Sequence, residues 1–305
     1  HFTCDGNRSR NQTGHCIKLN GNADYTVYSS IIRDVSLNYA PFSGFYADFV
    51  SEIQLVDFEA GWNGTGVEFR RASESKIQGI ISMGQQDGLL VADSSDFDID
   101  VHAEFLTRHG IYLKNTDLSD VNFVVYHNGE HGVLLEGSDY NTLRGVTRGN
   151  SRDGDGQFDG ILLQDSSHNI VKGVQSQGEG ASLRHRYGIG EAGSADYNRI
   201  ESNNVQHAVT SVQRVGPNST VRGNTGYTTE SSGTASIPAG ATSVQISHGL
   251  AVAPSPRHCS VTPTNSLGQA TKFWANDFGP TGFTIYVDSD PGPSPATFAW
   301  SCAVY

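Results

Sequence analysis

Five side chains that can carry charge or move a proton recur at regular intervals along the middle of the chain. They are Asp87, His109, His131, Asp159 and Tyr187, which lie 22, 22, 28 and 28 residues apart. Histidine titrates near neutral pH, and carboxylates serve as acids, bases or nucleophiles, so this set could perform acid–base chemistry. It could do so only if the fold returns the chain to the same place after each interval.

The residues in and beside this set suit the chemistry of acidic sugars. A lyase or an epimerase acting on a uronic acid must neutralise the sugar carboxylate, and Arg108 or Arg186 could do this. The enzyme must also remove the proton from C5, and His109, His131 or Tyr187 could accept it. A site for a uronic acid is therefore one hypothesis.

A glycoside hydrolase is the alternative, because it needs two carboxyl groups whose separation decides the stereochemistry. Glu130 with Asp159, or Asp153 with Asp155, could supply them. Asp153, Asp155 and Asp159 also have the spacing of oxygen ligands for calcium, although acidic glycine-rich loops often hold no metal. The sequence requires no cofactor, with calcium in this loop as the alternative.

A regular series of glycines marks the repeat that would align these residues. Six of the glycines open the same phrase, glycine then apolar, any residue, apolar, and a period of roughly 20 to 50 residues indicates stacked repeats. Short strands separated by Ser/Asn/Asp/Gly turns, without helical periodicity, predict an all-β fold. We expect a right-handed parallel β-helix of 22-residue coils, with one earlier coil near Cys16. The glycines are Gly44, Gly66, Gly88, Gly110, Gly132, Gly160 and Gly188.

Two insertions locate a binding face on this scaffold. Both 28-residue steps carry their six extra residues just before the column, in segments 150–157 and 178–185. Insertions in repeat proteins gather on the binding face, so we expect a wall beside the column and a cleft between them. Asp87, Arg108, Arg186 and Arg152 are the expected substrate-binding residues.

Two other interpretations of the column stay open. It could be a solvated polar corner whose side chains form hydrogen-bonded ladders. Alternatively, if the strand runs back through the glycine, alternation of side chains would place Arg108, Glu130 and Arg186 on the surface. The histidines would then support them from below.

A second column predicts an assembly surface. The residues two places after the glycines should point outward, and several are Leu or Tyr on consecutive coils. An exposed apolar stripe of this length usually marks an interface, so we expect a homotrimer, with coverage by a loop of the same chain as the alternative. The residues concerned are Tyr46, Leu90, Tyr112, Leu134 and Leu162.

A second domain follows the repeats. The glycine phrase ends after Gly188, and from Ser236 short segments alternate apolar and polar residues between Pro/Gly-rich turns. We predict a β-helix over 1–226, a linker over 227–235 and a small antiparallel β-sandwich over 236–305. Five aromatic residues of this domain could form its core or a sugar-binding platform: Phe273, Trp274, Phe283, Phe298 and Trp300.

The four cysteines fall into two local pairs, Cys4 with Cys16 and Cys259 with Cys302. An even number paired by region predicts two disulfides and an oxidising compartment, with four free thiols as the alternative. The net charge of −12 argues against nucleic-acid binding, and no apolar run reaches membrane-spanning length. We expect a signal peptide or further N-terminal residues before His1, and a location outside the cell or on a virion or cell surface.

The phrases TRHGIYLKN, YHNGEHGVLLEGS and DGILLQDSSHNIVKG resemble the β-helix repeats of mannuronan C5-epimerase catalytic modules and related carbohydrate-active β-helices. The resemblance spans roughly residues 44–204. The Tyr-Gly-Phe-Asp-Pro-His catalytic stretch of those epimerases is absent, because Tyr187-Gly188 is followed by IGEAG. A β-helix followed by a small sandwich is also similar to viral tail spikes that degrade polysaccharides. The resemblance implies a polysaccharide-binding lyase or hydrolase, with a non-catalytic adhesin, fibre or surface protein as the alternative.

Overall fold

The computed structural model describes residues 2–6 and 13–304 of the 305-residue chain. The chain divides into two compact units, His1–Thr220 and Val221–Tyr305. Among the described residues, no helix has the length and apolar character needed to cross a membrane.

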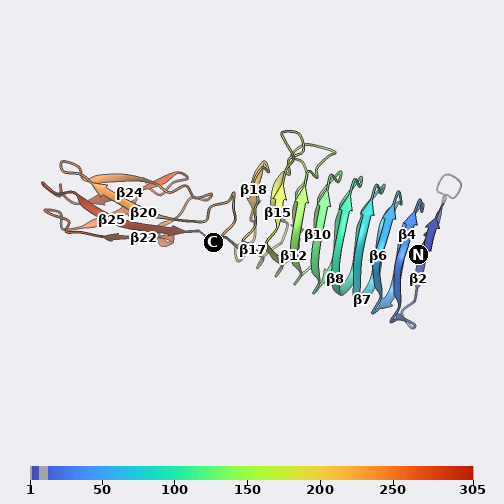
Figure 1. Cartoon of the computed structure of the whole chain (residues 1–305). Helices are drawn as coiled ribbons and strands as arrows, with labels where there is room; N and C mark the ends of the chain where they lie inside the picture. The colour runs from blue at the N-terminus through green and yellow to red at the C-terminus, as the bar shows by residue number, and fades with distance from the viewer. Residues whose placement is uncertain (1, 7–12, 305) are drawn as a thin grey trace. The chain divides into compact units, whose positions relative to one another are not determined.

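The first unit is a parallel β-helix, as the glycine period predicts (Figure 1). Its strands form one 19-stranded sheet, in which strands pair in parallel with those of neighbouring coils. The strands are β1 (Phe2–Asp5), β2 (Ile17–Asn20), β3 (Val27–Tyr28), β4 (Ile31–Asn38), β5 (Ser43–Ser51), β6 (Gln54–Gly61), β7 (Thr65–Ser82), β8 (Leu89–Glu104), β9 (Ile111–Asp117), β10 (Asp120–Tyr126), β11 (Val133–Glu136), β12 (Thr142–Arg148), β13 (Ile161–Gln164), β14 (Ile170–Lys172), β15 (Gln175–Gln177), β16 (Tyr187–Ala192), β17 (Arg199–Glu201), β18 (Thr210–Gln213) and β19 (Thr220–Arg222).

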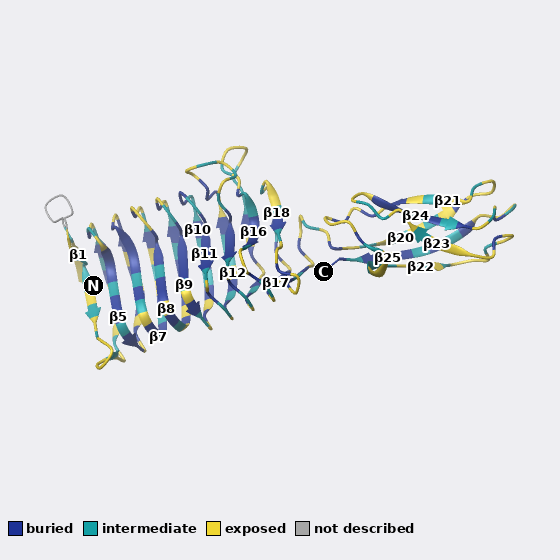
Figure 2. Cartoon of the chain, turned by 180° about the vertical axis from the view of Figure 1, so that it is seen from behind, coloured by how far each residue is buried: buried dark blue, intermediate teal, exposed yellow. Residues whose placement is uncertain are grey.

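The repeat sets the register of the strands. Leu89 pairs with Ile111, and Ile111 pairs with Val133, each one place after its glycine. These side chains are fully buried, so the apolar columns stack inside the β-helix. Figure 2 shows buried residues recurring along the strands of successive coils. The earlier coil near Cys16 is present as well, because β2 pairs with β5.

Glycine is required where the coils approach each other most closely. A Cβ atom at Gly66 would overlap the Ile81 side chain and lie 2.6 Å from the carbonyl oxygen of Gly88. The same close approach recurs at Gly88, where the carbonyl oxygen of Gly110 would lie 2.5 Å away. A side chain at these positions would therefore force the coils apart, which explains the regular glycine.

A ladder of buried asparagines ties the last coils together. The backbone N–H of Asn141 donates to Asn169 Oδ1 at 2.8 Å, and that of Asn169 donates to Asn198 Oδ1 at 2.8 Å. All three side chains are fully buried. The amides thus satisfy backbone groups that the turn leaves without strand partners.

The second unit is an antiparallel β-sandwich of two three-stranded sheets, β20-β25-β22 and β21-β24-β23. Phe283, Phe298 and Trp300 lie in its core, whereas Phe273 and Trp274 are 37% and 45% exposed. Its elements are β20 (Glu230–Ile237), β21 (Ser243–Ser247), the 3-10 helix η1 (Pro256–His258), β22 (Cys259–Pro263), β23 (Phe273–Asn276), β24 (Gly282–Val287) and β25 (Ala296–Ala303).

The predicted linker and one of the predicted disulfides differ from the structure. The predicted linker 227–235 overlaps strand β20, which begins at Glu230 and pairs with β25. The predicted bridge between Cys4 and Cys16 is absent, because both are free thiols and Cys16 Sγ instead donates to the Cys4 carbonyl oxygen at 3.4 Å. The bridge between Cys259 and Cys302 is present and joins paired residues of β22 and β25.

Candidate functional site

The structure aligns the predicted column, but most of it lies beneath the surface. Successive backbone bonds stack its members, because Gly88 N–H donates to the His109 carbonyl at 2.9 Å and Gly160 N–H donates to the Tyr187 carbonyl at 2.9 Å. His109 is only 4% exposed and His131 9%. Asp87 and Asp159 are buried too.

The preceding column covers these side chains. Arg108 and Arg186 expose 43% and 40% of their side chains, and Glu130 exposes 28%. This matches the second interpretation of the sequence, in which the charged residues line the surface and the histidines support them. The accessible chemistry therefore belongs to the arginines and to Glu130.

Four residues from three coils form what we call the Arg108 cluster: Asp87, Arg108, His109 and Glu130. Arg108 Nη1 lies 3.3 Å from Asp87 Oδ2, and Arg108 Nε lies 4.0 Å from Glu130 Oε2. His109 Nε2 lies 3.2 Å from Glu130 Oε2. Glu130 is thus held from behind by a buried imidazole and from the side by a guanidinium.

Burial sets the charges of the two covered members. It raises the pKa of Asp87 to about 6, against the opposing effect of the Arg108 charge. It lowers the pKa of His109 to about 3, and the nearby His131 and Arg108 act in the same direction. His109 is therefore neutral at pH 7, and its buried Nδ1 has no hydrogen-bond partner among the described residues.

Asp159 is fully committed to its neighbours. Arg186 binds it with both Nε and Nη2, at 2.9 and 2.7 Å, and the Tyr187 N–H donates to it at 3.1 Å. Its own N–H donates to His131 Nδ1 at 2.9 Å, so His131 carries its hydrogen on Nε2. Burial lowers the pKa of His131 to about 4. Asp159 and His131 therefore hold the surface residue Arg186 in place from below, and Asp159 has no access to a substrate.

Tyr187 remains partly exposed at the end of the column. The Arg186 guanidinium lies 4.9 Å from the centre of its ring. A Cβ atom at Gly190 would lie 3.1 Å from Tyr187 Cδ2, so the glycine leaves room for the ring. Tyr187 could thus reach a ligand that also contacts Arg186.

The two insertions form the expected wall, which we call the insertion wall (residues 150–157 and 178–185). Gly156 N–H donates to the Arg184 carbonyl at 2.8 Å, and Arg184 Nη2 lies 2.8 Å from Asp155 Oδ2. Figure 1 shows these loops projecting beyond β15. Arg152 Nη1 donates to the His127 carbonyl at 3.0 Å, so Arg152 lies outside the Arg108 cluster.

The wall does not gather the three carboxylates predicted as calcium ligands. Asp155 pairs with Arg184 and Asp159 with Arg186. Residues 2–6 and 13–304 contain no group of three His, Cys, Asp or Glu side chains placed to hold a metal ion. Calcium at Asp153, Asp155 and Asp159 therefore stays a prediction without a preformed ligand set.

The apolar stripe is covered rather than exposed, which corrects the sequence prediction. Tyr112, Leu134 and Leu162 are 8%, 8% and 7% exposed and pack against each other, with Leu90 beside them. The ring of His109 lies 5.4 Å from that of Tyr112, so the stripe and the column bury one another. Tyr46 is likewise only partly exposed.

A shallow pocket extends this face toward the N-terminal coils. It has a volume of about 330 Å³, and its lining includes Phe42, Glu68, Arg70 and Gln86. Arg70 Nε donates to Glu68 Oε1 at 2.6 Å. Since Gln86 directly precedes Asp87, the pocket borders the Arg108 cluster.

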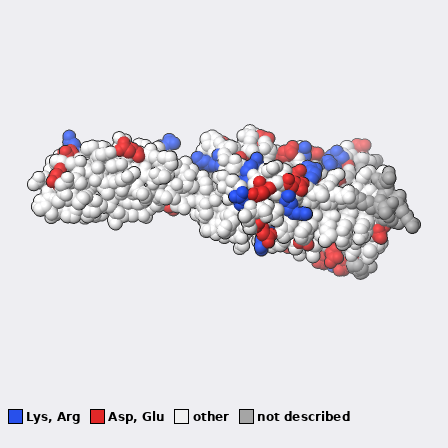
Figure 3. All heavy atoms as spheres, turned by 90° about the horizontal axis from the view of Figure 1, so that it is seen from above, with Lys and Arg blue, Asp and Glu red and all other residues white. Residues whose placement is uncertain are grey.

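On the side where the insertion wall projects, acidic and basic side chains are interleaved rather than separated by sign (Figure 3).

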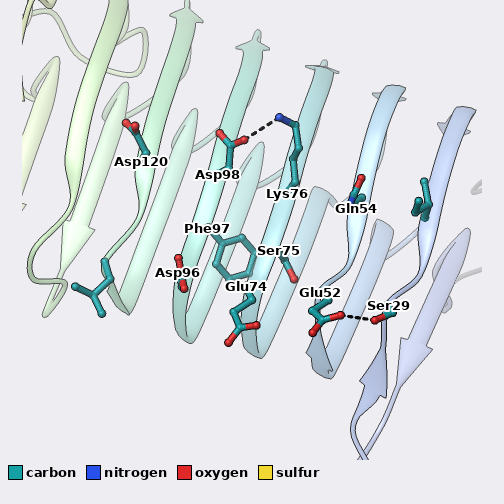
Figure 4. A pocket seen from close by; sticks show the side chains of 12 residues that line it. Ser29, Glu52, Gln54, Glu74, Ser75, Lys76, Asp96, Phe97, Asp98 and Asp120 are labelled. Carbon is teal, nitrogen blue, oxygen red and sulfur yellow. Dashed lines mark hydrogen bonds and ion pairs between the residues drawn. The ribbon is translucent and has the colours of Figure 1, made fainter.

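An acidic groove was missed by the sequence analysis (Figure 4). It has a volume of about 830 Å³ and is lined by Glu52, Glu74, Asp96, Asp98 and Asp120, among others. Its one basic residue, Lys76, lies with Nζ 2.7 Å from Asp98 Oδ2. The sequence contains a pattern that could have predicted this groove, because the positions eight and ten places after the glycines carry these charged residues on successive coils.

Comparisons with known proteins place the fold of this chain among β-helix proteins. A family model described as "Periplasmic copper-binding protein (NosD)" matches residues 47–235, more than half of the chain. No curated protein matches the sequence.

Three solved structures share the β-helix. The A-modules of the Azotobacter vinelandii mannuronan C-5 epimerases AlgE6 and AlgE4 give TM-scores of 0.61 and 0.57, with 19% and 21% identity. They cover 65% and 64% of this chain, and 58% of each module is matched. The enzymatically active domain of bacteriophage CBA120 tailspike protein 2 gives 0.50 at 15% identity, covering 63% of this chain and 34% of that domain. The chain thus spans less than two thirds of these structures, and the likeness establishes the fold.

Proposed function

The chain belongs to the family described as periplasmic copper-binding protein (NosD), and on this β-helix scaffold we propose that it binds and cleaves an extracellular polysaccharide. We assign the reaction to the face that carries the Arg108 cluster, Arg186 and Tyr187. The observation that carries the proposal is the exposed pair of Arg108 and Glu130, held over buried histidines beside the insertion wall.

Copper plays no part in the proposal. The family description implies it, but the described ranges 2–6 and 13–304 hold no group of three or more potential ligands placed for a metal ion. The most histidine-rich part of the face does not fit either. His131 Nδ1 accepts the Asp159 N–H, and the ring is buried, so this nitrogen is already used.

The proposed substrate is an acidic polysaccharide. Arg108 has a half-exposed guanidinium whose nearest carboxylate, Asp87, lies at 3.3 Å, so it retains N–H groups for a ligand. A uronate carboxylate could pair with these groups in the two-point geometry that arginine favours. Such pairing would withdraw charge from the sugar and ease removal of the C5 proton.

Glu130 is the proposed base. It is the accessible carboxylate of the Arg108 cluster, and His109 Nε2 lies 3.2 Å from it. The imidazole is neutral, because burial lowers its pKa to about 3, so it adds no positive charge beside Glu130 and leaves the carboxylate able to accept a proton. Tyr187 is the proposed donor to the leaving oxygen.

A hydrolase has weaker support from the geometry. The pairs considered from the sequence include Asp159 and Asp155, yet each is already bound by an arginine. Asp87 is a second carboxyl beside Glu130, with its pKa raised to about 6 by burial, but its side chain is only 3% exposed. We therefore favour elimination, with hydrolysis as the other outcome of the test.

Two variants test the proposal. Arg108→Ala should raise KM on a uronate polymer at least about tenfold, because a charge-assisted contact is lost. Glu130→Gln should lower kcat about a hundredfold or more while binding stays within about twofold. The matched control is Arg144→Ala, since Arg144 is an equally exposed arginine that pairs with Asp120 away from this face.

The readout separates the classes of function. Ultraviolet absorbance of an unsaturated product reports a lyase, and new reducing ends without that absorbance report a hydrolase. Binding without either product would support the adhesin or fibre alternative. Wild-type turnover in both variants would show that the reaction occurs elsewhere.

Location outside the cell or on a virion, and a homotrimer, remain parts of the proposal. The trimer was expected through the apolar stripe, but Tyr112, Leu134 and Leu162 are already covered within one chain. A trimer would therefore need a different surface, and mass in solution at micromolar concentration would detect it.

A further inference from the structure

One corner of the β-helix carries bulky side chains on five consecutive coils. We call it the aromatic corner: Tyr39, Trp62, Met83, Phe105 and His127. Each adopts the left-handed backbone conformation, with φ between 52° and 57°. Each N–H donates to a carbonyl of the next coil, as Trp62 does to Ser82 at 3.2 Å and Met83 to Glu104 at 3.0 Å. The five residues therefore form one continuous ladder.

The choice of residues at this corner opposes the local backbone preference. Left-handed conformation costs a residue with a Cβ atom about 1–2 kcal/mol, and Gly, Asn and Asp accept it most easily. A second corner of the same coils follows that preference only in part, with Asp93, Asn115 and Gly137 but also Phe49 and Arg71 in the same conformation. At the aromatic corner none of the five residues is Gly, Asn or Asp, which points to a role beyond the turn itself.

The aromatic corner is also exposed. Tyr39, Trp62, Met83 and Phe105 are 41%, 43%, 45% and 40% exposed. Four coils at about 4.8 Å spacing make a strip about 14 Å long and one side chain wide. Its exposed area is on the order of 350 Å², well below the roughly 800 Å² per partner of a stable protein interface. A strip this narrow fits a single extended chain better than a folded protein.

The strip leads to the Arg108 cluster. Phe105 precedes Arg108 by three residues, and the Arg152 guanidinium of the insertion wall lies 5.7 Å from the Phe105 ring centre. The next member, His127, pairs with Glu179 of the same wall. The wall therefore covers the C-terminal end of the ladder, and Tyr39, Trp62 and Met83 extend outward from it.

We propose that the aromatic corner is a track that binds the polysaccharide chain beside the Arg108 cluster. Sugar rings present apolar C–H faces, and these pack favourably against aromatic and thioether surfaces. A linear polymer can contact several coils at once, whereas a short fragment held at the Arg108 cluster cannot reach the outer rungs. The inference rests on the proposed function and adds the binding of long chains to it.

The ladder has a structural alternative, because Tyr39 and Trp62 stack on each other with ring centres 5.3 Å apart. A matched control exists at a third corner, where Tyr140, His168 and Tyr197 stack at 4.8 and 4.9 Å. Tyr140 is 56% exposed and has φ 59°, close to the φ of 54° at Trp62. Tyr140 and Trp62 thus have similar backbone conformations, are both partly exposed and both stack on a neighbouring ring. They differ in their place on the surface.

The test compares Trp62→Asn with Tyr140→Asn in the full chain, because asparagine accepts the left-handed backbone. Affinity is measured for a long uronate polymer and for its shortest bound oligosaccharide. Trp62→Asn should weaken polymer binding about fivefold, since an aromatic contact contributes roughly 1 kcal/mol, and leave the oligosaccharide unchanged. Tyr140→Asn should leave both affinities within about twofold of wild type. Thermal unfolding of each variant checks that the fold is retained.

Equal polymer affinity of wild type and Trp62→Asn would overturn the track while leaving the proposed function intact. Equal losses in Trp62→Asn and Tyr140→Asn would overturn it as well, because the ladder would then act through stability. If the wild-type chain neither binds nor cleaves any uronate or neutral polysaccharide, the proposed function fails and the track fails with it.

Discussion

Three buried histidines should make the β-helix sensitive to acid. Burial lowers the pKa of His109, His131 and His185 to about 3, 4 and 3. Because these values lie below the ordinary 6.5, the unfolded chain takes up protons first as the pH falls below 6.5. The histidines therefore favour the folded state fully above pH 6.5, and that contribution is lost on acidification. Asp87 acts oppositely between pH 6 and 4, because its pKa is raised to about 6.

Acidification therefore gives a net loss of stability, because the unfolded chain binds three protons at the histidines while the folded chain binds one at Asp87. We expect the free energy of unfolding to fall by about 3 kcal/mol per pH unit between pH 6 and 4.5, at about 1.4 kcal/mol per uncompensated proton. His131→Asn should roughly halve this slope, and His207→Asn, at an exposed position, is the control variant. Denaturant unfolding at several pH values measures the slope. A stability that is flat or rises on acidification would contradict the account.

The same residues show what sequence could predict about the site. The period identified His109, His131 and Asp159 as neighbours, and the structure stacks them. It could not decide which column lies uppermost, because that depends on how Tyr112 and Leu134 pack against the histidines. In the structure Glu130 is the accessible group and the histidines lie buried beneath it, as the second interpretation of the sequence allowed.

Among the elements, the asparagine ladder should carry much of the stability of the last coils. Asn169 Oδ1 accepts the Asn141 N–H at 2.8 Å, and its Nδ2 donates to the Ser138 carbonyl at 3.0 Å. Asn169→Ala would leave both buried groups unpaired, at about 1–3 kcal/mol each. We expect a loss of about 3 kcal/mol in the free energy of unfolding.

The control for Asn169→Ala is Leu118→Asn. Leu118 is 62% exposed with φ 58°, so asparagine should be neutral or stabilising there by up to about 1 kcal/mol. Denaturant unfolding of both variants measures the difference. If Asn169→Ala proves as stable as wild type, the buried amides are not needed to satisfy the coil.

The sequence predicted the strands better than the corners. A 22-residue period with glycine and two apolar positions defines the register, and β8 to β9 and β9 to β11 pair as that period requires. Left-handed corners occupied by Trp62 or Phe105 could not be foreseen, because such residues normally avoid this backbone. Those departures are the positions from which the binding track was inferred.

For the molecule as a whole, the bridge between Cys259 and Cys302 should stabilise the sandwich alone. It joins β22 to β25 and encloses a sequence separation of 43 residues, for which roughly 3–4 kcal/mol is expected. Replacing both cysteines with alanine should lower the unfolding temperature of the sandwich and leave that of the β-helix unchanged. Calorimetry can resolve the two transitions. A shift of the β-helix transition would contradict independent stabilisation of the two units.

The domain plan was predictable in outline and not in detail. The change from glycine phrases to alternating strands identified a β-helix and an antiparallel sandwich. The start of β20 at Glu230 lies within the polar stretch TTESSGT and could not be predicted. This edge strand begins with small residues, so its alternation of apolar and polar side chains is weak. Cys4 and Cys16 are near each other without a bridge, which spacing alone could not decide.

The central claim is that the face with Arg108 and Glu130 is where the polysaccharide reacts. A crystal structure of Glu130→Gln soaked with a uronate oligosaccharide tests it most directly. The account predicts a sugar carboxylate on the Arg108 guanidinium, with the chain running toward Phe105 and Trp62. A sugar bound instead in the acidic groove lined by Glu74 and Asp98, with the Arg108 face empty, would contradict it.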